Sequence, residues 1–332
     1  MATSIHDPAL RAAYAECERL AGSHYENFPV ASRLLPAAMR PHIAALYAFA
    51  RTADDFADEG QRPVAERLRL LDDWQNRLHA CVTESVADDR VFLALGATIR
   101  ACHLPLSLFD DLLSAFRQDI TTHRYDTWSA LLDYCRRSAN PVGRLVLRIA
   151  GYDDAALDGS SDALCTALQL TNFWQDLELD WRNGRLYVPL DDIAAEGADI
   201  ADLDGRRMTE PWQRVMSRVS ARTKASFDAG RQVCDGVHGR LRYELRFTWL
   251  GGVRMLDRLA HVDYDVFARR PRIGIADMPL LVSRAVFWNI RRERPGVTGS
   301  SPFGKSQGAP STSRAAPATR REAGRDAPVT KP

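Results

Sequence analysis

The chain has 332 residues, of which 45% are hydrophobic and 26% charged, and its formal net charge is +1. This balance is typical of a globular chain with a sizeable core, and it argues against a disordered or fibrous one. The last 38 residues hold six Lys or Arg and two acids, so the rest is slightly acidic and no basic nucleic-acid surface is expected.

The six cysteines are scattered and form no Cys-x-x-Cys pair. This spacing indicates reduced thiols and a cytoplasmic protein, with neither disulfides nor zinc. The first residues are polar and acidic, which predicts no signal peptide. No run of about 18 apolar residues occurs, so no membrane-spanning helix is expected.

Helical periodicity dominates the chain, and no period-two alternation is long enough for a sheet. Asp7-Pro8 predicts an N-cap followed by proline at the first helical position. The predicted helices cover residues 7–22, 36–59, 63 onward, 91–102, 105–119, 126–150, 160–181, 211–233, 238–259 and 277–289. We therefore expect an all-α bundle of about ten helices.

The helix predicted for residues 36–59 carries an acidic motif. Its apolar stripe runs through Ile43, Leu46 and Ala50, and Asp54 and Asp58 continue the same face. A buried carboxylate is costly unless a cation or hydrogen-bond donors meet it, so a positive partner is expected. A solvent-facing acidic segment is the alternative, since Asp-Asp pairs occur elsewhere in the chain.

Residues 126–150 contain the run Ser-Ala-Asn-Pro-Val-Gly at 138–143. Proline and glycine inside a helical pattern predict either a kink, which in a bundle can open room for a ligand, or a boundary between two helices.

The helix predicted for residues 160–181 carries a second motif, because Asn172, Asp176 and Asp180 recur every four residues. Two helices that present carboxylate and amide oxygens form the environment that Mg²⁺ prefers, shared with substrate phosphates. The sequence therefore predicts a cavity in the bundle, with Mg²⁺ and a diphosphate at its mouth and an apolar depth.

No predicted strand is followed by Gly-x-Gly-x-x-Gly, so a dinucleotide fold is not expected. A Gly-x-x-x-x-Gly-Lys run does occur at residues 299–305, but no predicted strand precedes it and no predicted helix follows it, so a P-loop is not expected. Residues 295–332 are rich in Pro, Gly, Ser, Thr and Ala. These residues would bury too little apolar surface to offset the entropy lost on ordering. They are therefore predicted to form a disordered tail after one domain of residues 1–294.

The two motifs together, Arg51-x-x-Asp54-Asp55-x-x-Asp58 and Asn172-x-x-x-Asp176-x-x-x-Asp180, resemble the squalene and phytoene synthase family. Within that family the resemblance is strongest to the bacterial hydroxysqualene synthases of hopanoid biosynthesis. It implies an all-α isoprenoid-synthase fold with a central cavity, Mg²⁺ as cofactor, and cleavage of an allylic or cyclopropylcarbinyl diphosphate.

The resemblance also implies roles for particular residues. The metal-binding positions are Asp54, Asp58, Asn172, Asp176 and Asp180, and the four acids among them are the catalytic candidates. The substrate-binding candidates are Arg51, Gln169, Arg185, Tyr187, Tyr47 and Asn140.

Two departures from the family pattern bear on the substrate. Gln175 stands where phytoene and presqualene diphosphate synthases usually have arginine, and Glu26 lies in a segment that usually reads His-Ser-x-Ser-Phe. Lower positive charge suits an enzyme that holds one diphosphate, which favours presqualene diphosphate as the single substrate.

The predicted reaction is ionisation, rearrangement of the carbocation beside ring faces such as Tyr47, Phe49 and Tyr134, and capture by water to give hydroxysqualene. For each of these rings, plain core packing is the alternative. One alternative function is a head-to-head prenyl synthase that joins two allylic diphosphates; another is a helical binding protein on a dead synthase fold. An apolar substrate also makes peripheral contact with the inner face of the membrane plausible, with hand-off to other hopanoid-pathway enzymes.

Overall fold

The computed structural model describes residues 7–23, 35–58, 62–83 and 89–288. Within these ranges every named element is a helix, and the one β-type contact is an isolated bridge between Arg124 and Leu186. The elements are α1 (Pro8–Ser23), η1 (Ala37–Met39), α2 (Arg40–Asp58), α3 (Val64–Thr83), α4 (Arg90–Cys102), α5 (Leu106–Thr121), α6 (Trp128–Ser138), α7 (Asn140–Ile149), α8 (Ala155–Gln175), α9 (Leu177–Arg182), α10 (Leu190–Glu196), α11 (Ala201–Asp204), α12 (Glu210–Gly230), α13 (Val233–Gly236), α14 (Gly239–His261), η2 (Ile275–Asp277) and α15 (Met278–Val286). The predicted all-α fold is confirmed.

Side-chain caps explain several of the helix starts. Asp7 accepts a hydrogen bond from the backbone N–H of Ala9 at 2.9 Å, and α1 begins at Pro8 as predicted. Asp89 accepts from two backbone N–H groups at the start of α4, and Asp154 does the same for α8. The short helices α10 and α11 were not predicted, because four to seven residues are too few to show a periodic pattern.

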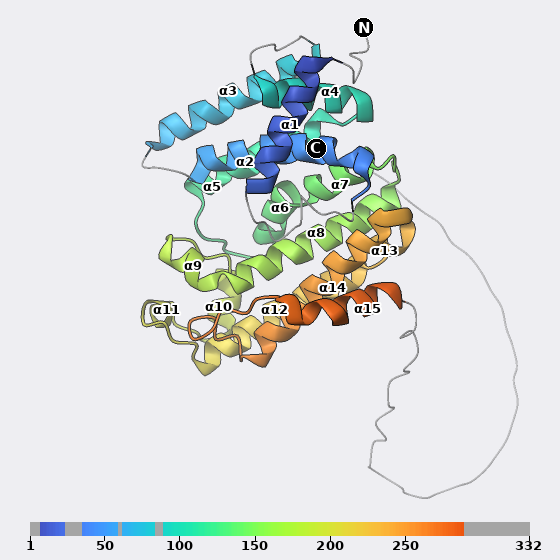
Figure 1. Ribbon diagram of the computed structural model, residues 1–332. Coiled ribbons are helices and arrows are strands. Elements are labelled where there is room, and N and C mark those ends of the chain that lie inside the picture. The colour runs from blue at the N-terminus through green and yellow to red at the C-terminus, as the bar shows by residue number, and fades with distance from the viewer. Residues whose placement is uncertain (1–6, 24–34, 59–61, 84–88, 289–332) are drawn as a thin grey trace, which may run out of the picture. The chain divides into compact units, whose positions relative to one another are not determined.

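Helix α8 lies at the centre of the bundle (Figure 1), with α6 and α7 on one side and α12 and α14 on the other. Two glycines allow the neighbours to approach closely. A Cβ atom on Gly143 of α7 would lie 2.4 Å from the Ser161 Oγ of α8, and one on Gly230 of α12 would lie 2.6 Å from the Leu164 backbone nitrogen. Gly143 therefore serves tight helix packing.

Two predicted helices are each divided in the structure. Residues 126–150 form α6 and α7 with a boundary at Ala139, so the boundary interpretation holds and the kink does not. Residues 160–181 were predicted as one helix, but the chain leaves helical geometry at Asp176, with φ −101° and ψ 11°. Backbone hydrogen bonds of 2.8 Å still run from Asp176 to Asn172 and from Asp180 to Asp176, which keeps the spacing of four.

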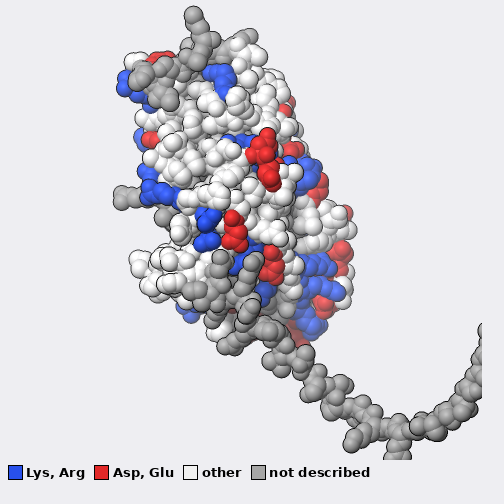
Figure 2. All heavy atoms as spheres, turned by 90° about the vertical axis from the view of Figure 1, so that its right-hand side faces the viewer, with Lys and Arg blue, Asp and Glu red and all other residues white. Residues whose placement is uncertain are grey.

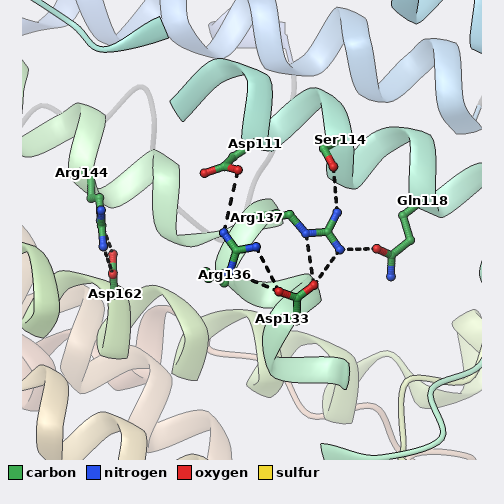
Figure 3. A network of polar contacts seen from close by, with 8 residues as sticks. All are labelled: Asp111, Ser114, Gln118, Asp133, Arg136, Arg137, Arg144 and Asp162. Carbon is green, nitrogen blue, oxygen red and sulfur yellow. Dashed lines mark hydrogen bonds and ion pairs between the residues drawn. The ribbon is translucent and has the colours of Figure 1, made fainter. Parts of the chain in front are cut away.

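Arginine side chains fasten neighbouring helices to each other (Figure 3). Arg137 of α6 donates to Ser114 of α5 at 2.9 Å and also bonds Gln118 of the same helix. Arg144 of α7 donates to Asp162 of α8 at 2.9 Å through its Nε. These contacts fasten α5 to α6 and α7 to α8.

On the face shown in Figure 2, basic and acidic side chains are interspersed among uncharged ones. Within the part of the chain that the structure describes, no helix is both long and apolar enough to cross a membrane. These residues belong to one compact unit, which spans 1–290. The predicted tail, residues 295–332, lies outside the described residues and stays a prediction, and so does Glu26.

Candidate active site

The first acidic motif occupies the last turns of α2. Arg51 donates to Asp54 at 3.4 Å and pairs with Asp55 at 2.7 Å. The side chains of Asp54 and Asp58 are 35% and 38% exposed, so the expectation that the helix face buries them is wrong. They stand at the end of the buried stripe, where solvent and a ligand can reach them.

Arg185 joins the two motifs across 127 positions of sequence. Both of its terminal nitrogens bond the two carboxylate oxygens of Asp58, one of them at 3.2 Å. Its own backbone N–H donates to the Asp180 carbonyl at 2.8 Å, which ties it to the second motif. The hydrogen bonds to Asp58 raise the pKa of Arg185, so the guanidinium stays charged.

The second motif spans the break between α8 and α9. Asp176 is only 12% exposed and forms an ion pair with Arg270, from the segment after α14. Burial raises the pKa of Asp176, opposed by the charge of Arg270 and by hydrogen bonding from Arg270 and Asn172. Burial, helped by the negative charges of Asp176 and Asp58, raises the pKa of Asp180 to about 7.

The contacts of Arg185 and the pKa shift of Asp180 indicate that the two acidic motifs lie close together. Asp58 lies close enough to raise the pKa of Asp180, and Arg185 lies close enough to lower it. The carboxylate oxygens of the two motifs are the ligands that Mg²⁺ prefers. Among the described residues, no group of three or more His, Cys, Asp or Glu side chains lies close enough together to hold a metal ion. The donor set thus fits Mg²⁺ chemically, while arginines neutralise Asp58 and Asp176.

A cluster of aromatic rings adjoins the acids. The Tyr187 and Phe173 rings stack with their centroids 3.7 Å apart and nearly parallel, and Tyr134 packs on both. Tyr125 completes the cluster, stacking on Tyr187 at 5.8 Å. All four rings are buried and pack together next to Arg185, and we call this cluster the aromatic wall.

Asp119 of α5 is a site residue that the sequence analysis missed. It is 8% exposed, accepts a hydrogen bond from the Tyr134 hydroxyl at 3.0 Å, and lies within electrostatic range of Arg185, Asp58 and Asp54. In the sequence, Asp119 could have been found as a single acid that continues the apolar face of Leu112 on the same helix. Arg270 was also missed, because it lies in an irregular segment with no periodic pattern.

The remaining predicted residues have different surroundings. Gln169 is half-buried, one turn before Asn172 on α8, and Tyr47 is half-buried one turn before Arg51 on α2. Asn140 is buried and accepts a hydrogen bond from Thr166 at 2.9 Å, which joins α7 to α8. Their roles in binding substrate stay predictions.

Phe49 does not line this site. It is fully buried in a separate cluster, where it packs against Trp74, Phe92 and Phe109. Its suggested role beside a carbocation is therefore wrong, since it fills the core between α2, α3, α4 and α5.

One pocket does adjoin the second motif; it is lined by Gln175, Asp176, Glu178, Leu179, Arg182, Val266 and Arg270. The central cavity stays a prediction.

Comparison with known proteins agrees with this geometry. The family model described as squalene/phytoene synthase matches residues 21–276. A hydroxysqualene synthase of Zymomonas mobilis is 37% identical over 222 residues, which cover 66% of this chain and 73% of that protein. A phytoene synthase of Arthrospira platensis is 28% identical over 280 residues, which cover 80% of this chain and 90% of that protein.

Solved structures have the same fold. The squalene synthase HpnC from Alicyclobacillus acidocaldarius is 41% identical with a TM-score of 0.72, over 77% of this chain and 95% of that one. A dehydrosqualene synthase in complex with a ligand has a TM-score of 0.75 at 21% identity, over 84% of this chain and 97% of that one, a likeness of fold. The chain belongs to the squalene/phytoene synthase family.

Proposed function

We propose that this chain converts presqualene diphosphate and water into hydroxysqualene and diphosphate, with Mg²⁺ as cofactor, in hopanoid biosynthesis. The observation that carries the proposal is the meeting of two acidic motifs beside an aromatic wall, where Arg185 binds Asp58 and is followed by Tyr187. Two relatives named hydroxysqualene synthase, 37% and 36% identical, support the choice of reaction.

The acidic motifs would hold the metal through Asp54 and Asp58 on one side and through Asn172, Asp176 and Asp180 on the other. When bound, Mg²⁺ neutralises the diphosphate and makes it a better leaving group. The raised pKa values of Asp176 and Asp180 support this assignment, because a cation would relieve the unfavourable burial of their charges.

The chain's own side chains serve the rest of the reaction. Arg51 and Arg185 supply positive charge to the diphosphate oxygens. The carbon–oxygen bond to the diphosphate breaks, and the leaving group takes the electron pair. The ring faces of Tyr134, Phe173 and Tyr187 stabilise the carbocation and exclude bulk water. The carbocation rearranges with cleavage of a cyclopropane bond. A water oxygen then bonds to the new cationic carbon and passes one proton to the released diphosphate, which leaves a hydroxyl group.

The second candidate is a head-to-head prenyl synthase that makes presqualene diphosphate or phytoene from two allylic diphosphates, as the relatives named phytoene synthase suggest. Gln175 alone does not exclude it, because Arg270 brings positive charge to Asp176 from another part of the chain. The local charge argument drawn from Gln175 is therefore weakened, and the choice rests on the more similar relatives. A helical binding protein is disfavoured, since the partly buried carboxylate of Asp180 would be destabilising without a cation.

The test supplies the purified chain with Mg²⁺ and either presqualene diphosphate or farnesyl diphosphate, without NADPH. We expect Mg²⁺-dependent diphosphate release and hydroxysqualene, identified by mass spectrometry, from presqualene diphosphate, and little conversion of farnesyl diphosphate. Efficient formation of presqualene diphosphate from farnesyl diphosphate would support the second candidate. Release from neither substrate would support the binding protein.

We also propose a cytoplasmic location with peripheral contact at the inner face of the membrane and hand-off to other hopanoid-pathway enzymes. Large exposed apolar side chains gather on η2 and the end of the described chain: Ile275, Leu280, Val282, Val286 and Phe287. Exposed apolar side chains near the end of the described chain suit contact with the surface of a bilayer, where an apolar product would leave. Co-sedimentation with phosphatidylglycerol vesicles tests the contact, and no binding by the intact chain would argue against it.

A further inference from the structure

The segment after α14 contacts two consecutive residues of the second acidic motif. Arg270 pairs with Asp176, and the Pro271 carbonyl oxygen accepts a hydrogen bond from the side-chain amide of Gln175 at 2.8 Å. We infer that Gln175 is a positioning residue, whose amide holds Pro271 so that the Arg270 guanidinium reaches Asp176 and a diphosphate bound there. This inference rests on the proposed function only in that Asp176 serves a metal–diphosphate site.

The location of Gln175 suits this role. It is the last residue of α8 and is 7% exposed, so packing fixes its side chain. Pro271, also buried, has a fixed φ angle and disfavours helical geometry for the residue before it, which is Arg270. The hydrogen bond at Pro271 therefore helps to fix the chain next to Arg270. Hydrogen bonds from Arg206 to the Phe267 carbonyl and from Arg258 to the Arg272 carbonyl also fix this segment.

The Arg270 guanidinium is placed to exchange the Asp176 carboxylate for a diphosphate oxygen. Its side chain is 38% exposed, whereas that of Asp176 is 12% exposed, so the guanidinium spans from solvent to a nearly buried carboxylate. Both residues also line the pocket beside α9. The ion pair neutralises Asp176 in the ligand-free chain, and a modest side-chain rotation would turn the same guanidinium toward a diphosphate oxygen. The bond from Gln175 to Pro271 keeps it within reach in both cases.

The test compares Gln175→Met, which keeps the length and loses the donor, with Arg270→Met and the double variant. The probe is inorganic pyrophosphate with Mg²⁺, measured by isothermal titration calorimetry. Each single variant is expected to weaken binding roughly tenfold, as the loss of a hydrogen bond to a charged group does. The double variant should bind no more than about twofold worse than Arg270→Met, because Gln175 acts through Arg270.

Gln75→Met is the control, since it removes an amide hydrogen bond to Asp110 at 2.6 Å and the acceptor of one from Arg117 at 2.8 Å, both between α3 and α5. It should leave pyrophosphate affinity unchanged. Hydrogen exchange of residues 268–274 in the ligand-free chain gives a second readout, and Gln175→Met should speed it. If Gln175→Met does not fold, Gln175→Leu, which also lacks the donor and adds no charge, takes its place in every comparison.

The inference is overturned if the Gln175 variant binds like the wild type, if its effect adds fully to that of Arg270→Met, or if exchange in 268–274 is unchanged. It also fails if the wild type does not bind Mg²⁺ and pyrophosphate. If the coupling is seen but presqualene diphosphate is not turned over, the proposed function fails while this inference stands.

Discussion

The carboxyl group of Asp119 should make the protein less stable as pH rises toward neutrality. Burial raises its pKa to about 7, and the charges of Asp58 and Asp54 act in the same direction. The hydrogen bond from Tyr134 and the charge of Arg185 oppose the shift without cancelling it. Asp119→Asn removes the titrating group and keeps its size and an acceptor for the Tyr134 hydroxyl.

The magnitude follows from the two pKa values. The ordinary value is 3.8, so between about pH 4 and 7 the unfolded chain is ionised while the folded chain keeps its proton. Folding therefore binds a proton in this window, and stability falls as pH rises through it. About three pH units at 1.36 kcal/mol each give an upper limit of about 4 kcal/mol. The stability of Asp119→Asn relative to wild type should rise by up to that amount between pH 4 and 8.

The assay is urea denaturation in EDTA at pH 4 and pH 8, with free energies of unfolding fitted to the wild type and to the variant. Asp277→Asn is a control for a carboxyl whose pKa shifts the other way. A backbone hydrogen bond from Gly274 and the charges of Arg258 and Arg254 hold the pKa of Asp277 below its ordinary value of 3.8. Its titration therefore lies below the tested range, and this variant should be destabilised by nearly the same amount at both pH values. An equal difference between Asp119→Asn and wild type at both pH values would refute the reasoning.

Asp54→Asn and Asp176→Asn should each lower Mg²⁺-dependent turnover by on the order of 100-fold with an unchanged circular dichroism spectrum, and near-normal rates at saturating Mg²⁺ would remove the metal assignment. Gly143→Ala should cost about 1–3 kcal/mol and lower the melting temperature by several degrees, because its Cβ would meet the Ser161 Oγ at 2.4 Å. Gly159→Ala, whose Cβ meets nothing within 4 Å, is the control and should not destabilise. Removal of the last 38 residues should leave melting temperature and turnover largely intact, and a loss of several degrees would show that the tail docks on the body.

The sequence predicted the helical class and most of the helices because their apolar faces repeat with helical period. It also predicted the acids of both motifs, since a carboxylate that continues an apolar stripe is visible from spacing alone. The spacing of Asn172, Asp176 and Asp180 survives the break at Asp176, because backbone hydrogen bonds bridge it.

What the sequence could not predict depends on contacts between distant segments. The pairs of Asp58 with Arg185 and of Asp176 with Arg270 join residues far apart in the chain, and no local pattern specifies such partners. Phe49 is a second example of this limit. It lies two residues before Arg51 in the first motif, yet it points into the core, which only the packing of α3, α4 and α5 determines.

The most direct test of the account is the origin of the product's hydroxyl oxygen. Presqualene diphosphate, Mg²⁺ and the intact chain would be incubated without NADPH in ¹⁸O-labelled water, and the product analysed by mass spectrometry. Capture of the carbocation by water predicts hydroxysqualene that carries the label in its hydroxyl group. Unlabelled hydroxysqualene, or squalene that forms only when NADPH is added, would contradict the proposal.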